Sequence, residues 1–302
     1  MHFILRVVAP VACLSLLSTL AFTADRQSLR ARQGDKQIEI FAGGKLVTAY
    51  KYSDAQKYPY FWPLNGPTSE KSVTTESTEP YPHHHSLFFG CAKVNGGNYW
   101  QDTHERWQIL SQGPKIVEAK GDRVVITDEC RWKQPGKDAV MADHRRITVS
   151  APSATLRFID FEITLEPLVD IRIEKTNHSL FSARMVPELS VKAGGTLVNA
   201  EGNLAEKGTF GVASPWCDYT GTRDGVREGL AIFQHPDNRW YPAKWFTRDY
   251  GFFSPTPMYW PEGDHLALPK GEKVTLRYRV VIHTETAEIA RIGALFGQYA
   301  AK

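Results

Sequence analysis

Residues 273–283 read KVTLRYRVVIH, and the alternation of apolar and polar residues in this stretch decides the fold. The apolar side chains stand at every second position: Val274, Leu276, Tyr278, Val280 and Ile282. Side chains of an extended strand point alternately to its two faces, so this spacing predicts a strand with one buried face. An amphipathic helix would place its apolar residues three or four positions apart.

The same alternation recurs along most of the chain. Residues 155–165 alternate in this way around Phe161 and Ile163. Shorter runs of the same kind occupy residues 37–41, 45–50, 86–94, 106–111, 123–132, 144–149, 181–191, 229–235 and 250–254. Clusters of Gly, Pro, Asn and Asp separate the runs, as expected of turns between strands.

One stretch alone has helical spacing. From Thr286 to Tyr299, the apolar residues Ile289, Ile292 and Phe296 recur three or four positions apart, and Thr286 is a suitable N-cap. A dozen or more strands with one C-terminal helix predict an all-β fold, a large antiparallel β-sandwich. No repeat of fixed period is present, which argues against a propeller or a solenoid.

Composition narrows the class of protein further. The chain has 302 residues, of which 42% are hydrophobic and 23% charged, and all-β sandwiches of this size often form a single domain. We therefore expect one sandwich domain over residues 25–302. Lys and Arg number 36 against 33 Asp and Glu, and no basic cluster occurs, so we expect no nucleic-acid partner.

Residues 1–24 have the pattern of a signal peptide. Arg6 precedes an apolar stretch from Val7 to Leu20, and mostly small residues follow before Asp25. The stretch is short for a membrane-spanning helix, although an uncleaved anchor is the alternative. No apolar run of 20 residues follows residue 22. We therefore expect a periplasmic or extracellular protein with no membrane span after signal cleavage.

Three cysteines remain after that cleavage, Cys91, Cys130 and Cys217. An odd number excludes a complete disulfide framework but permits one bridge, and three buried thiols are the simpler alternative.

Residues 81–90, YPHHHSLFFG, contain the most informative motif. In an extended chain His83 and His85 would share one face and His84 the other, whereas a bend after Pro82 would bring His83 and His84 into one cleft. A histidine near neutral pH can transfer protons, ligate a metal or hydrogen-bond a hydroxylated ligand. A core or turn histidine with a satisfied ring is the alternative.

A further histidine, His104, stands between Asp102 and Glu105. It can complete a site for a divalent metal with His83 or His84, because facial metal sites combine two histidines with one carboxylate. No ligand signature such as H-E-x-x-H is present, so we expect no metal and no other cofactor.

Later motifs combine carboxylates with aromatic rings, which is typical of sugar sites. The residues expected to be catalytic are His83, His84, His104, Glu201, Asp218 and His235. Those expected to bind substrate are Asn95, Asn199, Trp216, Tyr219 and Tyr250. We expect the six catalytic candidates to gather on one concave face. The alternative is that the segment around Asp218 is a turn with packed aromatics.

These motifs resemble a bacterial family of unknown function whose members commonly carry the label "methane oxygenase PmoA". The segment from His83 to Gly90, followed by Val94-Asn95-Gly96, is similar to the family pattern His-His-Arg/Lys-Gly/Ser-Leu-Trp-Phe-Gly…Val-Asn-Gly. Further matches follow in order at residues 199–202, 216–221, 232–236 and 248–253. The resemblance covers residues 45–290. It implies a secreted β-sandwich, similar to the galactose-mutarotase-like supersandwich and often encoded among polysaccharide-utilisation functions.

Two observations limit what this resemblance implies: one concerns the family label, and the other concerns three positions of the family pattern. The methane monooxygenase subunit of that name spans the membrane several times, whereas this sequence has no such spans, so the label conflicts with the sequence. His85, Cys91 and Gln234 stand where the family commonly has Arg or Lys, His and Asp. A family site that needed that histidine or that aspartate would be altered here.

Together these features predict a secreted carbohydrate-active protein, with a carbohydrate or glycoside as its ligand. We expect an enzyme, a hydrolase, lyase or epimerase, in which histidine and carboxylate transfer protons. The first alternative is a glycan-binding sandwich without catalytic activity. The second is a metal-dependent oxygenase, as the family label suggests. The oligomeric state stays open.

Overall fold

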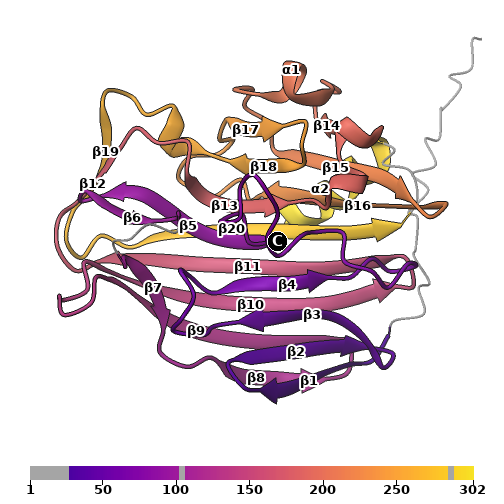
Figure 1. Ribbon diagram of the computed structural model, residues 1–302, viewed down its shortest axis with the longest axis horizontal. Coiled ribbons are helices and arrows are strands. Elements are labelled where there is room, and N and C mark those ends of the chain that lie inside the picture. The colour runs from indigo at the N-terminus through magenta and orange to yellow at the C-terminus, as the bar shows by residue number, and fades with distance from the viewer. Residues whose placement is uncertain (1–26, 102–105, 285–288) are drawn as a thin grey trace, which may run out of the picture.

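The computed structural model describes residues 27–101, 106–284 and 289–302, and these fold into two large antiparallel sheets (Figure 1). The two sheets pack face to face around one hydrophobic core, and a helix lies near the C-terminus. The all-β antiparallel sandwich with a C-terminal helix that the sequence predicts is therefore confirmed.

The first sheet has eleven strands within the described residues. They are β1 (Leu29–Gly34), β2 (Gln37–Ala42), β3 (Lys45–Lys51), β4 (Tyr60–Leu64), β5 (Leu87–Val94), β6 (Gly97–Tyr99), β12 (Ile171–Glu174), β13 (Ser179–Arg184), β17 (Trp245–Arg248), β18 (Phe252–Pro255) and β19 (His265–Leu268). The main path through this sheet runs β1-β2-β3-β4-β5-β13-β18-β17. Strands β12 and β6 pair with β5, and β19 pairs with β12.

The second sheet has nine strands, again counted over the described residues. They are β7 (Gln108–Ser111), β8 (Lys115–Lys120), β9 (Arg123–Lys133), β10 (Met141–Ser153), β11 (Leu156–Pro167), β14 (Thr196–Asn199), β15 (Trp216–Arg223), β16 (Val226–Gln234) and β20 (Val274–Thr284). The main path runs β14-β15-β16-β20-β11-β10-β9-β7. The stretch 273–283 thus forms a central strand, β20, whose Leu276, Val280 and Ile282 are fully buried in the core as predicted.

An aromatic stack joins the two sheets at their centre. Phe181 of β13 lies between Phe161 of β11 and Tyr278 of β20, with ring centroids 4.9 Å and 4.8 Å apart. All three rings are buried, so this stack combines hydrophobic burial with favourable ring geometry. It fixes which face of β13 points into the sandwich.

The opposite face of β13 carries polar residues. Because successive side chains alternate, Ser182 and Arg184 point away from the nine-stranded sheet. We call this side the outer face of the eleven-stranded sheet. The segment 65–86 crosses it, since the Thr75 backbone N–H donates to the Arg184 carbonyl and the His84 ring lies 4.3 Å from the Phe252 ring.

Helices occupy little of the chain. Besides short 3-10 turns at Pro187–Leu189, Val191–Ala193 and Pro257–Tyr259, the described residues contain α1 (Ala205–Thr209) and α2 (Ile289–Ala300). The predicted C-terminal helix is α2, and the expected cap Thr286 lies outside the described residues. None of the helices described is long and apolar enough to cross a membrane.

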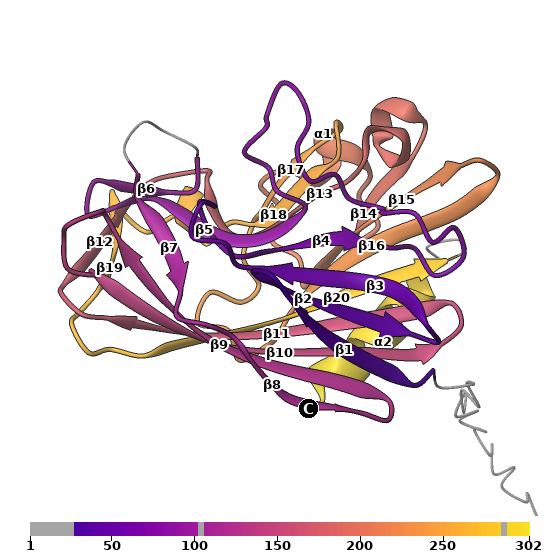
Figure 2. The same cartoon turned by 60° about the horizontal axis from the view of Figure 1, so that its bottom comes forward.

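Helix α2 covers part of the outer face of the nine-stranded sheet. Its Ile292, Leu295 and Tyr299 join a second apolar cluster with Trp216 and Phe233. Figure 2 shows α2 below β10 and β11, on the side away from β3 and β4. Cys91, Cys130 and Cys217 are all buried and free, which decides for the thiol alternative.

Replacing Phe181 by alanine should cost the protein about 3–5 kcal/mol in free energy of unfolding, because a buried ring between two sheets leaves a cavity. Chemical denaturation would measure this loss. The control Val117→Ala, at a side chain with 58% exposure, should change the free energy little. Equal and small losses in the two variants would contradict a stack that joins the sheets.

Candidate functional site

Six side chains meet on the outer face of the eleven-stranded sheet. We call them the histidine–arginine cluster: Tyr81, His83, His84, His178, Arg184 and Tyr250. The His83 ring lies 4.6 Å from the His84 ring and 6.2 Å from the His178 ring, between centroids. The Arg184 guanidinium carbon lies 4.3 Å from the centre of the Tyr250 ring. The cluster therefore joins proton-transferring groups, a cation and aromatic faces in one place.

Turns in the chain bring the first histidines together. The backbone N–H of His84 donates to the Tyr81 carbonyl, so the segment bends between Tyr81 and His84. His83 and His84 consequently converge, as the bent alternative required. His85 turns elsewhere: its Nδ1 lies 2.9 Å from the Glu76 carbonyl oxygen and its ring stacks on Tyr60.

Tyr81 is the solvent-exposed member of the cluster, with 36% of its surface accessible. Its ring stacks on the rings of both His84 and Tyr250, at 5.2 Å and 5.0 Å between centroids. This one side chain therefore covers both partners from the solvent side.

Burial controls the charge of two histidines. His84 is 4% exposed, and this burial, followed by the charges of His83 and Arg184, lowers its pKa to about 2. Burial, followed by the charges of His83 and Lys93, lowers the pKa of His178 to about 4. Both rings are therefore neutral at pH 7. Nδ1 of His84 is buried and has no hydrogen-bond partner among the described residues.

Within the cluster, Arg184 is a further buried group with unmet hydrogen-bonding capacity. It is 2% exposed, and its Nε and Nη1 have no hydrogen-bond partner in the described part of the chain. Burial lowers the pKa of the guanidinium, and the groups that oppose this lowering are tyrosines, Tyr250 foremost. Arg145, by contrast, donates from Nε and Nη2 to both carboxylate oxygens of Asp143 inside the core. A buried arginine without such a partner is costly unless a ligand supplies the anion.

A pocket of about 710 Å³ adjoins the cluster at His178. We call it the lysine pocket, and its lining residues are Ala92, Lys93, Gly96, Gly97, Asn98, Gln101, Lys175, Thr176, Asn177, His178 and Tyr259. Both lysines are exposed, and Lys93 Nζ donates to the Lys175 carbonyl at 3.1 Å. No Asp or Glu is among the described residues that line it. Two lysines thus line the pocket, and its size is typical of small-ligand sites.

Some predicted site residues lie at this cluster. His83, His84 and Tyr250 are members, and Tyr219 lies near enough to Arg184 that the two affect each other's pKa. The Tyr219 hydroxyl donates to the Arg248 carbonyl at 2.8 Å. His104 lies outside the described residues, so the structure does not test its place.

Asp218 lies elsewhere, which corrects the expectation of one shared face. It neighbours Tyr219 in β15, so the two side chains point to opposite faces of the strand. Asp218 is fully buried and bonded to His283 Nε2 at 2.7 Å and to the Thr220 hydroxyl at 2.6 Å. Trp216, on the same face as Asp218, packs in the apolar cluster under α2.

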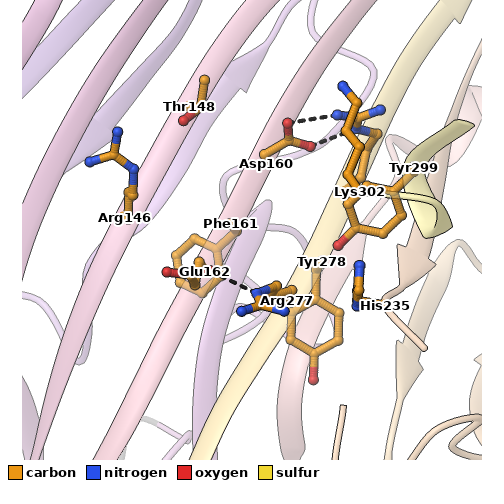
Figure 3. Close-up of a pocket in the computed structure, with 11 residues that line it drawn as sticks. Arg146, Thr148, Asp160, Phe161, Glu162, His235, Arg277, Tyr278, Tyr299 and Lys302 are labelled. Carbon is orange, nitrogen blue, oxygen red and sulfur yellow. Dashed lines mark hydrogen bonds and ion pairs between the residues drawn. The ribbon is translucent and has the colours of Figure 1, made fainter. Parts of the chain in front are cut away.

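His235 lies in a different hollow, of about 300 Å³, on the outer face of the nine-stranded sheet (Figure 3). Its Nδ1 accepts from the Asp237 backbone N–H, and its ring contacts Tyr299 edge to face. Arg279 in the same hollow is held by both oxygens of Asp160. The charges of this hollow are thus largely paired, unlike Arg184.

The remaining candidates also lie apart from the cluster. Glu201 is exposed, and Asn199 is buried with its Oδ1 accepting from the Asn203 backbone N–H. Asn95 fixes a turn, because its side chain bonds the Asp170 carbonyl and the Arg172 N–H. The expectation that the catalytic candidates gather on one face is therefore wrong for Glu201, Asp218 and His235.

Sequence reasoning missed three members of the cluster: Tyr81, His178 and Arg184. An available signal was Arg184 itself, a charged residue within a run expected to be a half-buried strand. Nothing in the local sequence marks His178, because its role follows from the pairing of β13 with β5.

Metal binding was the other possibility for these histidines. Among the described residues, no group of three or more His, Cys, Asp or Glu side chains is arranged to hold a metal ion. The combination of His83 and His84 with His104 lies partly outside that range, so the expectation of no metal is not tested there.

Comparison with known families assigns the chain to one of them. A family model described as "Family of unknown function (DUF6807)" matches residues 37–297, so the chain belongs to this family. The expected membership of a family of unknown function is confirmed. A search of curated proteins found no match.

Several solved structures resemble the chain. A galactose 1-epimerase from Lactobacillus acidophilus aligns with 86% of this chain and 98% of its own, at 8% identity and a TM-score of 0.41. An aldose epimerase homologue from C. elegans aligns with 86% of this chain and 99% of its own, at 8% identity and a TM-score of 0.33. An alpha-galactosidase from Lactobacillus brevis aligns with 86% of this chain and 40% of its own, at 9% identity and a TM-score of 0.35. Similarity at this level says nothing about activity or substrate.

The buried, neutral His84 predicts a pH dependence of stability. Its pKa is about 6.5 when unfolded and about 2 when folded, so below pH 6.5 the unfolded state gains a proton that the folded state lacks. The free energy of unfolding should therefore fall as the pH falls, by about 1.4 kcal/mol per pH unit from this residue. Denaturation of His84→Gln across this range should give a shallower slope, whereas the exposed-site control His144→Gln should not. Parallel slopes for wild type and His84→Gln would contradict a buried neutral ring.

Proposed function

We propose that the protein is a carbohydrate-active enzyme that works at the histidine–arginine cluster and the adjoining lysine pocket. One observation carries this proposal: neutral, buried histidines stand beside a pocket, and one of them has a ring nitrogen with no partner in the described structure. Ring nitrogens of this kind can accept a proton or a hydroxyl hydrogen bond from a ligand.

The composition of the cluster favours one kind of sugar chemistry. Most glycosidases use a pair of carboxylates that flank the bond to be broken. None of the six cluster members is a carboxylate, and Asp218 is held by His283 on another face. We therefore favour epimerisation or elimination, with His178 or His83 as base and Arg184 stabilising developing negative charge.

Tyr250 suits the role of proton donor in this scheme. Burial, followed by the charge of Tyr81, raises the pKa of its hydroxyl to about 12, so the group keeps its proton at neutral pH. Arg184 lies over the ring and opposes that rise in pKa. The hydroxyl is therefore protonated at rest and stands next to a cation that stabilises its anion.

A non-catalytic glycan-binding protein is the second candidate. The aromatic rings of Tyr250 and Tyr259 lie at the cluster and the pocket, and such rings stack on the C–H faces of sugars. Binding without turnover would follow if the histidines only hydrogen-bond the ligand.

Turnover assays separate these candidates. We expect purified protein to convert a member of a panel of glycosides and 3-keto-glycosides, with the same rate before and after treatment with a chelator. At least one of the variants His178→Gln and His83→Gln, which remove the two candidate bases, should lower kcat by about a hundredfold or more, whereas the matched histidine control His235→Gln should keep it. Tight binding with no turnover across the panel would favour the glycan-binding alternative. Loss of turnover after treatment with a chelator would favour a metal site and the alternative of a metal-dependent oxygenase.

We further propose that the protein is exported and that residues 1–24 are removed. The charged start, the apolar stretch and the small residues before Asp25 support this. N-terminal sequencing of protein recovered from the periplasm or medium of a bacterial host should begin at or near Asp25. Full-length protein retained in the cytoplasm would contradict export.

A further inference from the structure

We propose that the ligand of the lysine pocket and the histidine–arginine cluster is a saccharide that carries carboxylate groups, a uronic acid or an oligomer of uronic acids. Arg184 binds one carboxylate and the lysines of the pocket attract the next. This inference rests on the proposed function for the site and narrows its substrate class.

The first argument is the unpaired arginine. Arg184 offers Nε and Nη1, which are both buried and have no partner in the described part of the chain. These two N–H groups point from opposite sides of the guanidinium, so each can donate to an oxygen of an anionic ligand. A neutral sugar hydroxyl would satisfy the hydrogen bonds but would leave the buried charge without a counter-ion.

The charge of the pocket is the second argument, and it is independent of Arg184. Lys93 and Lys175 line the pocket together with His178, and none of the described lining residues is acidic. The Lys175 ammonium lies 5.4 Å from the centre of the Tyr259 ring, within the range of a cation–π contact. Two lysines on a concave wall raise the local concentration of anions.

Additional donors fit the hydroxyl groups of a sugar. Trp100 Nε1 and Ser182 Oγ are buried and have no hydrogen-bond partner among the described residues. The Trp100 ring lies 5.8 Å from the His178 ring, and Ser182 shares the outer face of β13 with Arg184. A small inorganic anion would use the cations but leave these donors unmet.

Access to Arg184 depends on Tyr81. Because this exposed ring stacks on His84 and on Tyr250, which in turn lies against Arg184, a ligand that displaces it reaches the guanidinium. A uronic acid could replace the lost stacking with its own C–H face against Tyr250.

The proposed function explains why a carboxylate would also help the reaction. A proton on the carbon that bears a carboxylate is hard to remove unless the negative charge of the carboxylate is neutralised. Arg184 would supply that neutralisation. In elimination the base takes this proton, the carbon–oxygen bond on the neighbouring carbon breaks, and the leaving oxygen receives a proton from Tyr250. In epimerisation the proton returns on the opposite face. Both outcomes balance without a further reactant.

Calorimetric titration with matched sugars tests the inference. D-galacturonate and its dimer should bind at least about tenfold more tightly than D-galactose and a neutral dimer, and the difference should shrink as salt is added. Acetate and inorganic phosphate should bind more weakly than the uronates. Equal affinity for acidic and neutral sugars would overturn the proposal, and so would phosphate or acetate binding as tightly as the uronates.

Variants assign the charge to particular residues. Arg184→Gln should remove the preference for the uronate, while Arg184→Lys should retain part of it. Lys93→Gln with Lys175→Gln, at exposed positions that tolerate substitution, should weaken uronate binding and flatten its salt dependence. Arg146→Gln, an exposed arginine in the hollow of Figure 3, should leave uronate binding unchanged. An unchanged preference in the double lysine variant would overturn the role of the pocket, even if Arg184→Gln failed to fold.

The titration also separates this inference from the proposed function. Turnover of neutral glycosides with no preference for uronates would leave the enzyme proposal standing and remove this one. Uronate-selective binding with no turnover would support the ligand class and favour the glycan-binding alternative.

Discussion

The stack of Phe161, Phe181 and Tyr278 is the contact on which the geometry of the site depends. It inserts one side chain of the eleven-stranded sheet between two rings of the nine-stranded sheet, at 4.9 Å and 4.8 Å. Once Phe181 points inward, the alternation of the strand leaves Arg184, three residues later, on the outer face. A shift of β13 by one residue would bury a guanidinium in an aromatic core, so the stack and the cluster are two consequences of one register.

The outer face then creates an unusual electrostatic environment. Two neutral histidines and a buried cation share one desolvated region, and the charge of Arg184 is one cause of the lowered pKa of His84. The core handles the same problem differently, since Arg145 receives both oxygens of Asp143, which also accepts from Trp132 Nε1. The protein thus pairs one buried arginine with a carboxylate and leaves two nitrogen atoms of another without a partner among its described residues.

Much of the fold could be predicted because strands have a short period that is visible in local sequence. The inward face of β20 and the helical spacing of α2 could both be predicted from this local pattern. The site was harder to predict because it depends on pairing between strands that are distant in the sequence. Ser179 of β13 lies opposite Cys91 of β5, and this pairing positions His178 beside residues almost a hundred positions earlier. Sequence adjacency also misled, since Asp218 and Tyr219 stand side by side in the chain but point to opposite faces of β15.

The departures from the family pattern gain a physical meaning from these positions. His85 turns toward Glu76 and Tyr60, away from His83 and His84. Cys91 is buried in the core, and Gln234 is buried where its side chain bonds the backbone of Ser214 and Ala243. None of the three belongs to the histidine–arginine cluster, whereas the matching residues His83, His84 and Tyr250 all do. The three departures from the family pattern therefore lie outside this cluster, whereas three of the matching residues lie within it.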